Sequence, residues 1–343
     1  MDKIDLRSDT VSWPTPKMRQ AMANAVVGDD VFGDDPTVNR LQAMAAERMG
    51  MEAGLFVASG TMGNLAAILT HCRRGEEMIL GDTSHTFLYE AGGASALGGV
   101  HPRTVPVQPD GTLRLEAIRA AVRPDNVHFP RSRLLCIENT HNTTGGQPLS
   151  REYMRAAIDL AHELGLKVHI DGARIFNAAV ALGVEARALV KGADSVSFCL
   201  SKGLCAPVGS VLCGPAAFID EARRVRKMLG GGMRQAGVLA AAGIVALEEM
   251  VDRLAEDHAN ACRLAEGLAT IKGIVIDPAR VKTNMVMFDL AESVKVTPEQ
   301  IVEAMAARGI VIRASRPFRL VTHYWITREH VDQAVKGFRE VLA

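Results

Sequence analysis

The chain has 343 residues, of which 48% are hydrophobic, and its 39 basic and 39 acidic side chains balance to a net charge of zero. This length suits one large domain plus a smaller one, with enough apolar residues for a sizeable core. The balanced charge indicates neither nucleic acid nor anionic membrane as a partner. Scarce aromatic residues with plentiful Ala, Gly and Met are typical of a helix-rich α/β enzyme.

The cysteines lie mostly in apolar segments and form no CxxC pair: Cys72, Cys136, Cys199, Cys205, Cys213 and Cys262. This spacing predicts no zinc site or disulfide framework and favours a reducing compartment. The polar start of the chain does not look like a signal peptide, and no apolar segment reaches membrane length. We therefore expect a cytoplasmic protein without a bound metal ion.

Residues 1–15 are polar and rich in turn formers, which favours an arm over a core strand. Thr15 is expected to cap a first helix, and an acidic loop at 28–36 leads into a second helix at 37–49. The segment from Gly54 then predicts a short strand, a tight turn and a helix that runs to about residue 72.

From residue 77 onward, short apolar segments alternate with helical patterns. Strands are expected at 77–80, 100–107, 133–139, 168–171, 195–200 and 208–213, and helices at 113–121 and 152–164. This alternation predicts an α/β fold with a mainly parallel sheet covered by helices on both faces. Ligands of such sheets bind beyond the carboxyl ends of the strands, where we expect Ser59, His85, Asn139, Asp171 and Lys202.

After about residue 252 the pattern becomes that of an α+β unit. A long helix to about residue 268 precedes strands at 274–276, 284–289, 310–314 and 319–325, a helix at 297–308 and a final amphipathic helix. We therefore predict an arm (1–15), a large domain (16–251) and a small C-terminal domain (252–343).

Lys202 follows the end of the apolar strand 195–200. Burial disfavours the charged amine, and the same desolvation makes it a nucleophile that can condense with a carbonyl. The plainer interpretation is a lysine that reaches along the sheet edge to solvent.

Ser59-Gly60-Thr61 forms a strand-to-helix turn whose free backbone N–H groups and helix dipole could bind an anion. Simple capping by Ser59 or Thr61 would explain the same residues. The turn is neither a Walker loop nor a dinucleotide fingerprint.

Asp171 ends an apolar strand, where a carboxylate needs a partner. Arg174 could form a structural ion pair with it. Alternatively, Asp171 could keep a ring nitrogen protonated, as pyridoxal phosphate (PLP) requires. PLP also needs an anion site and an amine for its aldehyde, which the 59–61 turn and Lys202 would supply.

Eight motifs in order, spanning residue 4 to the C-terminus, resemble the L-threonine aldolases, PLP enzymes of the aspartate-aminotransferase-like fold (fold type I). They are Arg7-Ser-Asp-Thr10, Ala58-Ser-Gly-Thr61, Ser84-His85 with Tyr89-Glu90, Glu138-Asn-Thr-His-Asn142 with Gly145-Gly146, His169-Ile-Asp-Gly-Ala-Arg174, Cys199-Leu-Ser-Lys-Gly-Leu-Cys205, Gly230-Gly-Gly-Met-Arg-Gln235 and Arg319-Leu-Val-Thr-His323.

The resemblance implies which residues hold the cofactor. Lys202 would bind its aldehyde, Asp171 would contact its ring nitrogen, and His85 would lie on the ring face. The remaining cofactor contacts would come from Ser59, Gly60, Thr61, Arg174, Lys227 and Arg234, the last two reaching across a subunit interface of a homotetramer.

The resemblance also implies a substrate site. Ser8, Arg174 and Arg319 would hold the amino-acid carboxylate, for which guanidinium groups are well shaped. His128 would lie near the substrate hydroxyl. Arg316, close to Arg319, is expected to be solvated.

The implied reaction is retro-aldol cleavage of L-threonine, L-allo-threonine or another β-hydroxy-α-amino acid to glycine and an aldehyde, with His85, His128 or a water as the base. Two alternatives are another PLP lyase of this fold, which eliminates at Cβ or racemises, and a non-catalytic ligand-binding member. The preference between the threonine epimers is not decided by these residues.

Overall fold

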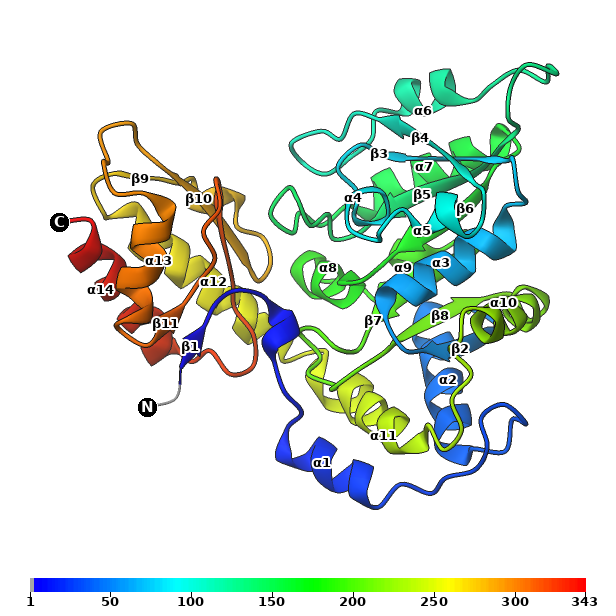
Figure 1. Cartoon of the computed structure of the whole chain (residues 1–343), viewed down its shortest axis with the longest axis horizontal. Coiled ribbons are helices and arrows are strands. Elements are labelled where there is room, and N and C mark those ends of the chain that lie inside the picture. The colour runs from blue at the N-terminus through cyan, green and yellow to red at the C-terminus, as the bar shows by residue number, and fades with distance from the viewer. Residues whose placement is uncertain (1–2) are drawn as a thin grey trace.

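The structure is a computed structural model that describes residues 3–343, and it has two lobes (Figure 1). The larger lobe contains a seven-stranded sheet in the order β2-β8-β7-β6-β5-β3-β4. These strands are β2 (Ala53–Val57), β3 (Glu77–Gly81), β4 (His101–Val105), β5 (Ser132–Glu138), β6 (Lys167–Asp171), β7 (Ser195–Cys199) and β8 (Ser210–Gly214). All neighbours pair in parallel except those of β8, which runs antiparallel to β7 and β2. The predicted mainly parallel α/β sheet is confirmed.

Helices cover both faces of this sheet. Alternate residues of β2 enter different core clusters: Leu55 and Val57 join residues of α3 and α10, whereas Phe56 joins residues of α2. The helices of this lobe are α1 (Pro16–Ala23), α2 (Pro36–Met49), α3 (Gly60–His71), α4 (His85–Leu88), α5 (Gly93–Ala96), α6 (Leu115–Ala121), α7 (Arg151–Glu163), α8 (Ile175–Leu182), α9 (Ala186–Val190), α10 (Ala216–Met228) and α11 (Gly237–Val245).

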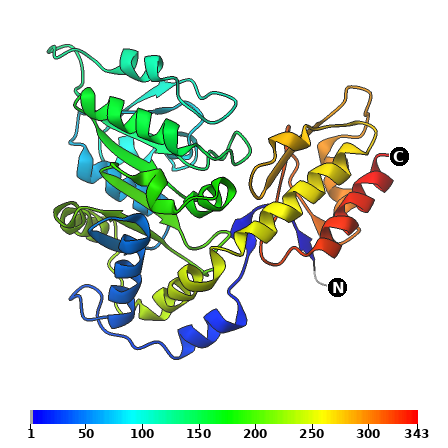
Figure 2. The ribbon, with the colours of Figure 1, turned by 180° about the vertical axis from the view of Figure 1, so that it is seen from behind.

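The smaller lobe packs helices on a three-stranded antiparallel sheet in the order β12-β10-β9. Its elements are α12 (Leu254–Ala269), β9 (Ile274–Val275), β10 (Met285–Leu290), α13 (Pro298–Ala306), β11 (Ile310–Val311), β12 (Phe318–Val321) and α14 (Arg328–Val341). Seen from behind, α12 runs from the large lobe along the smaller one (Figure 2). The helices and strands predicted after residue 252 are all present, most with shorter bounds.

The N-terminal segment differs from the predicted arm. Residues Ile4–Asp5 form β1, which pairs in parallel with β11. Ile4 and Leu6 are buried in the core cluster of the smaller lobe, beside Phe288 and Phe318. Tertiary pairing with a segment about 300 residues away therefore makes a short core strand out of a polar, turn-rich sequence.

The buried apolar residues of the two lobes form separate clusters. The largest includes Met18 and Leu254, and the second combines Ile4 and Leu6 with residues from Ala261 onward. The division at residues 251 and 252 stays a prediction. Within residues 3–343, no helix is both long enough and apolar enough to cross a membrane.

Candidate active site

The polar residues expected at strand ends lie at one edge of the seven-stranded sheet. Asp171 is the last residue of β6, Asn139 follows β5, and Lys202 follows β7 by three residues. His85 begins α4 after β3, and Ser59 precedes α3 after β2. Because these strands all point the same way, their carboxyl ends share an edge.

The 59–61 turn has the local structure of a capped helix. Ser59 is the N-cap of α3, and its Oγ accepts a hydrogen bond from Met62 N at 3.1 Å. A Cβ on Gly60 would lie 2.9 Å from the Sγ of Cys199, so glycine lets the turn approach β7 closely. Capping alone explains Ser59, and phosphate binding by Ser59, Gly60 and Thr61 stays a prediction.

Asp171 does not pair with Arg174, so the structural ion-pair interpretation is wrong. Arg174 instead donates to both carboxylate oxygens of Asp9, at 2.7 and 2.6 Å. Asp171 is only 2% exposed and accepts hydrogen bonds from Asn64 Nδ2 at 2.9 Å and Ala173 N at 3.1 Å. Within residues 3–343 it forms no ion pair with Lys or Arg.

Two further buried carboxylates surround Asp171. Glu138 accepts backbone hydrogen bonds from His85 at 2.7 Å and Asn142 at 2.8 Å. Burial and the charge of Asp171 raise the pKa of Glu138 to about 7. Glu90 meets His85 Nδ1 at 3.0 Å, and this hydrogen bond raises the pKa of His85.

His85, Glu90 and Asp171 offer ligand atoms that all lie within 4.8 Å of one another. Their closeness was not visible from the sequence, which shows no ligand cluster. One amide explains part of it, because Asn64 Nδ2 donates to both Glu90 and Asp171.

The residues at this edge fit PLP. Three buried carboxylates converge without a lysine or arginine paired to any of them in the described chain, and a protonated ring nitrogen is the kind of cation that Asp171 lacks. Lys202 is partly buried, and its carbonyl accepts a hydrogen bond from Ser12 Oγ at 2.9 Å. The charge of Lys202 helps to lower the pKa of Asp9.

Two guanidinium groups converge on Asn142. Arg319 Nη2 donates to Asn142 Oδ1 at 3.1 Å, and Arg174 Nη1 approaches the same oxygen at 3.5 Å. The Nε of Arg319 is buried and has no hydrogen-bond partner in the described part of the chain. Burial and the charge of Arg174 lower the pKa of Arg319 to about 10. An unsatisfied, desolvated guanidinium beside a second one is suited to bind a carboxylate.

Asp9 links Ser8 to this arginine pair. Burial alone would raise its pKa, but the charge and hydrogen bonds of Arg174 hold that pKa well below the usual range. Ser8 Oγ lies 3.4 Å from Asp9 Oδ1. Ser8, Arg174 and Arg319 are therefore brought together, as predicted for a carboxylate site, whereas Arg316 is exposed.

The beta-eliminating lyase family matches residues 5–293. Low-specificity L-threonine aldolase 1 of Arabidopsis thaliana is 51% identical over 348 residues, which cover 100% of this chain and 97% of that protein. The chain belongs to the L-threonine aldolase family. It is therefore a lyase, and this family and the wider beta-eliminating lyases depend on PLP.

A second relative agrees with this membership, and a solved structure agrees with the fold. The low specificity L-threonine aldolase of Escherichia coli (strain K12) is 48% identical and covers 99% of this chain and 99% of its own length. The solved structure of a Leishmania major threonine aldolase shares the fold, with a TM-score of 0.85 at 21% identity over 99% of this chain and 100% of that one.

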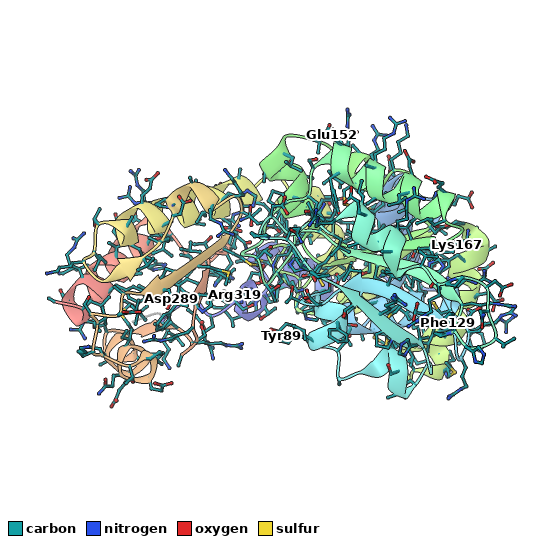
Figure 3. The ribbon with its side chains drawn as sticks, turned by 90° about the horizontal axis from the view of Figure 1, so that it is seen from above. Tyr89, Phe129, Glu152, Lys167, Asp289 and Arg319 are labelled. Atoms are coloured by element: carbon teal, nitrogen blue, oxygen red, sulfur yellow. The ribbon has the colours of Figure 1, made fainter. Side chains whose placement is uncertain are left out.

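Of the residues matched to aldolase motifs, His128 lies apart from the site. It belongs to an exposed loop before β5, at the amino end of the strand that carries Glu138 at its carboxyl end. Figure 3 shows its neighbour Phe129 at the far end of the large lobe, whereas Tyr89 and Arg319 lie between the lobes. Within one chain, His128 therefore cannot reach Lys202.

Lys227 and Arg234 flank the glycine loop after α10. A Cβ on Gly231 of this loop would meet Met62 in the first turn of α3, so the loop lies near the 59–61 turn. Lys227 is exposed, and Arg234 pairs with Asp29 at 2.9 Å. Their predicted contacts with the cofactor stay predictions.

Several polar residues of the site received no role from the sequence: Asp9, Asn64, Glu90, Glu138 and Asn142. All but Asn64 lie inside the aldolase-like motifs, so the motifs marked their positions without their function. Asn64 lies in the mostly apolar helix α3 and is 2% exposed. A buried amide in such a helix is a signal that it has a specific partner.

Proposed function

We propose that this chain cleaves L-threonine and L-allo-threonine to glycine and acetaldehyde by a PLP-dependent retro-aldol reaction, and that it accepts other β-hydroxy-α-amino acids. The names of its relatives at 51% and 48% identity support this proposal. The observation that carries it is Asp171, a buried carboxylate without a cationic partner among residues 3–343, at the sheet edge that also carries Lys202.

Bound PLP would supply an electron sink for the electrons of the broken Cα–Cβ bond. In our proposal Lys202 attaches the cofactor, Asp171 holds the ring nitrogen and His85 covers the ring. The other proposed contacts are those of Ser59, Gly60, Thr61, Arg174, Lys227 and Arg234.

The protein's own residues would determine which bond of the substrate breaks. Arg174 and Arg319, with Ser8, fix the substrate carboxylate and so decide which bond at Cα stands perpendicular to the cofactor ring. His85, His128 or a water between them accepts the hydroxyl proton. His85 can do so only when neutral, and its hydrogen bond to Glu90 raises the pH at which that holds.

The histidine role has a direct test. We expect His85→Asn and His128→Phe each to lower kcat by about 10²-fold, the usual size of a lost acid–base catalyst. If both variants kept near-normal cleavage, the base would not be a histidine.

The reaction itself is tested with three substrates and three separate product assays. L-threonine and L-allo-threonine should each yield equal amounts of acetaldehyde and glycine without ammonia. The competing function is β-elimination, which the description of the matched family suggests. Ammonia from L-serine or L-threonine, without glycine, would establish that function instead.

We also propose a cytoplasmic homotetramer, a dimer of dimers with sites at a subunit interface. His128 supports it, because this residue cannot reach Lys202 within one chain. So does the exposed group Phe87, Leu88 and Tyr89 beside the site, since large apolar side chains at a surface often mark an interface. A stable and fully active monomer in light scattering would contradict the shared site.

A further inference from the structure

A chain of buried polar side chains connects Asp171 to the opposite edge of the sheet. Its members come together because side chains repeat along a helix and along a strand with fixed periods. Asn64 and His71 are seven residues apart and so share a face of α3, while His169 and Asp171 share a face of β6. On β7, Ser195 and Ser197 lie directly opposite His169 and Asp171 in the parallel register.

Every neighbouring pair in this chain is within hydrogen-bonding distance. His71 Nε2 lies 2.8 Å from Ser195 Oγ, which lies 2.8 Å from His169 Nδ1. His169 Nε2 lies 3.1 Å from Asn64 Oδ1, and Asn64 Nδ2 donates to Asp171 Oδ2 at 2.9 Å. All of these residues except His71 are nine-tenths buried or more.

The carboxylate of Asp171 determines which atom donates in each of these hydrogen bonds. An ionised carboxylate only accepts, so the Asn64 amide nitrogen must face Asp171 and its oxygen must face His169. That oxygen also only accepts, and it takes hydrogen bonds from Ser197 Oγ at 2.6 Å and from a protonated Nε2 of His169. Each donor therefore points toward Asp171.

The remaining orientations follow if His169 is neutral. With its hydrogen on Nε2, its Nδ1 must accept from the Ser195 hydroxyl. Ser195 has then used its only hydrogen, so His71 Nε2 donates to it. Burial lowers the pKa of His169 to about 3 and that of His71 to about 4, which keeps both rings neutral at physiological pH.

We propose that His71, Ser195, His169 and Asn64 form a positioning relay that stabilises the negative charge of Asp171 and so sets how firmly it holds a proton on the ring of the bound cofactor. Aligned hydrogen bonds polarise one another, so each donor strengthens the next. The relay rests on the proposed function, because it acts on the cofactor only through Asp171.

Other charges also face the two ends of the relay. Asp171 is faced by His85, Glu90, Cys136, Glu138 and His141, and His71 by Lys167 and Asp194. The test therefore leaves these groups unchanged and substitutes members of the relay, of which Ser195 has no contact with Glu90 whereas Asn64 donates to it.

The test is a pH titration of the visible absorption of the PLP-bound enzyme. A weaker charge on Asp171 leaves less positive charge on the ring, so the Lys202 nitrogen should keep its own proton to higher pH. We expect the midpoint to rise by about 1 pH unit in Asn64→Leu, by about 0.5 in Ser195→Ala and by about 0.2 in His71→Phe. In Ser195→Ala, kcat should fall about 3-fold with KM nearly unchanged, as expected for an effect on the chemical step.

Ser132→Ala is the matched control. Ser132 lies at the same edge of the sheet as Ser195 and donates to the buried Glu77 at 3.0 Å, but it has no link to Asp171. Both serine variants should lose stability, and only Ser195→Ala should move the midpoint. A shift in neither, or equal shifts in both, would overturn the relay, whereas a protein that shows no visible PLP band would overturn the proposed function instead.

A second measurement needs no cofactor. Nitrogen-15 NMR of histidines in the ligand-free protein should show His169 neutral with its hydrogen on Nε2 from about pH 5 to 9, given the pKa of about 3. A hydrogen on Nδ1 would reverse the donor direction and rule the relay out.

Discussion

The two edges of the seven-stranded sheet each bury a carboxylate at a strand end, but they satisfy it differently. Glu77 begins β3, is fully buried and receives hydrogen bonds from Arg123 Nε at 2.9 Å and Ser132 Oγ at 3.0 Å. Asp171 ends β6, is nearly as buried, and within residues 3–343 its carboxylate receives hydrogen bonds only from amide groups.

This difference separates a structural acid from a functional one. A buried carboxylate that has its own guanidinium contributes to the fold, and removing either partner leaves an unpaired charge. A buried carboxylate that lacks one is costly in the isolated chain, and its cost is recovered when a ligand brings the positive charge. We therefore expect the cofactor at the edge whose buried carboxylate has no cationic partner among residues 3–343.

Neutralising each carboxylate should have opposite effects. Asp171→Asn should lower kcat for L-threonine by about 10³-fold, because the ring nitrogen loses its partner, while the stability of the ligand-free protein stays equal or rises. Glu77→Gln should leave cleavage intact and cost about 2 to 3 kcal/mol of unfolding free energy, since it breaks a buried pair whose arginine is partly exposed. Steady-state kinetics and urea unfolding of both variants would reveal whether the two roles are exchanged.

The arginine pair extends the comparison to the smaller lobe. Arg319→Gln should raise KM for L-threonine by about 10²-fold, because a charge-assisted contact with the substrate carboxylate is worth more than a neutral one. Arg316→Gln, three residues away and exposed, is the matched control and should change KM less than 2-fold, as surface substitutions do. An unchanged KM in Arg319→Gln would remove this residue from the carboxylate site.

Apolar segments were sufficient to predict the inner strands of the large sheet, because strands buried on both faces are nearly continuous apolar runs. The edge strand β4 was also predicted, although it is partly exposed and has the sequence His-Pro-Arg-Thr-Val. The helices α8 to α11 were not predicted. In α11 the sequence Gly-Val-Leu-Ala-Ala-Ala-Gly-Ile-Val is apolar on every face, so it shows no helical period.

The site was predictable where single residues end strands or closely follow them, as Asp171 and Lys202 do. Its pairings were not predictable, because they join distant segments: Arg174 was expected beside Asp171 on local spacing but meets Asp9, 165 residues earlier. Local spacing carries no information about such contacts. The role of Asn64 depends on the same kind of tertiary contact.

The pKa of Glu138 adds a pH-dependent test of stability at the carboxyl edge. Burial and the charge of Asp171 raise its pKa from 4.5 to about 7, so the folded protein binds this proton more tightly than the unfolded chain. Its contribution to stability is therefore present below pH 4.5 and is lost as the pH rises through 7. Removing this proton linkage in Glu138→Gln should make the ligand-free protein about 2 to 3 kcal/mol more stable than the parent at pH 8 but not at pH 4.

The measurement is thermal unfolding across this pH range, with Glu163→Gln as the control. Glu163 is an exposed glutamate that pairs with Arg119. Its variant should follow the pH dependence of the parent. If Glu138→Gln followed it too, the pKa of Glu138 would be the same in the folded and the unfolded protein, and the nearby charge of Asp171 would not affect it.

His128 tests whether the two edges are independent. If it acts in the reaction, a residue at the amino edge of one subunit's sheet lies at the carboxyl edge of the sheet in another subunit. Lys202→Ala and His128→Phe should each be nearly inactive alone. If the two residues serve one site from different subunits, a hybrid pair has one site with both defects and one with none. Mixing and refolding the two variants should then restore about a quarter of the parent activity. A mixture as inactive as its components would place both residues in the same subunit's site, which this fold does not permit, and would therefore exclude His128 from the reaction.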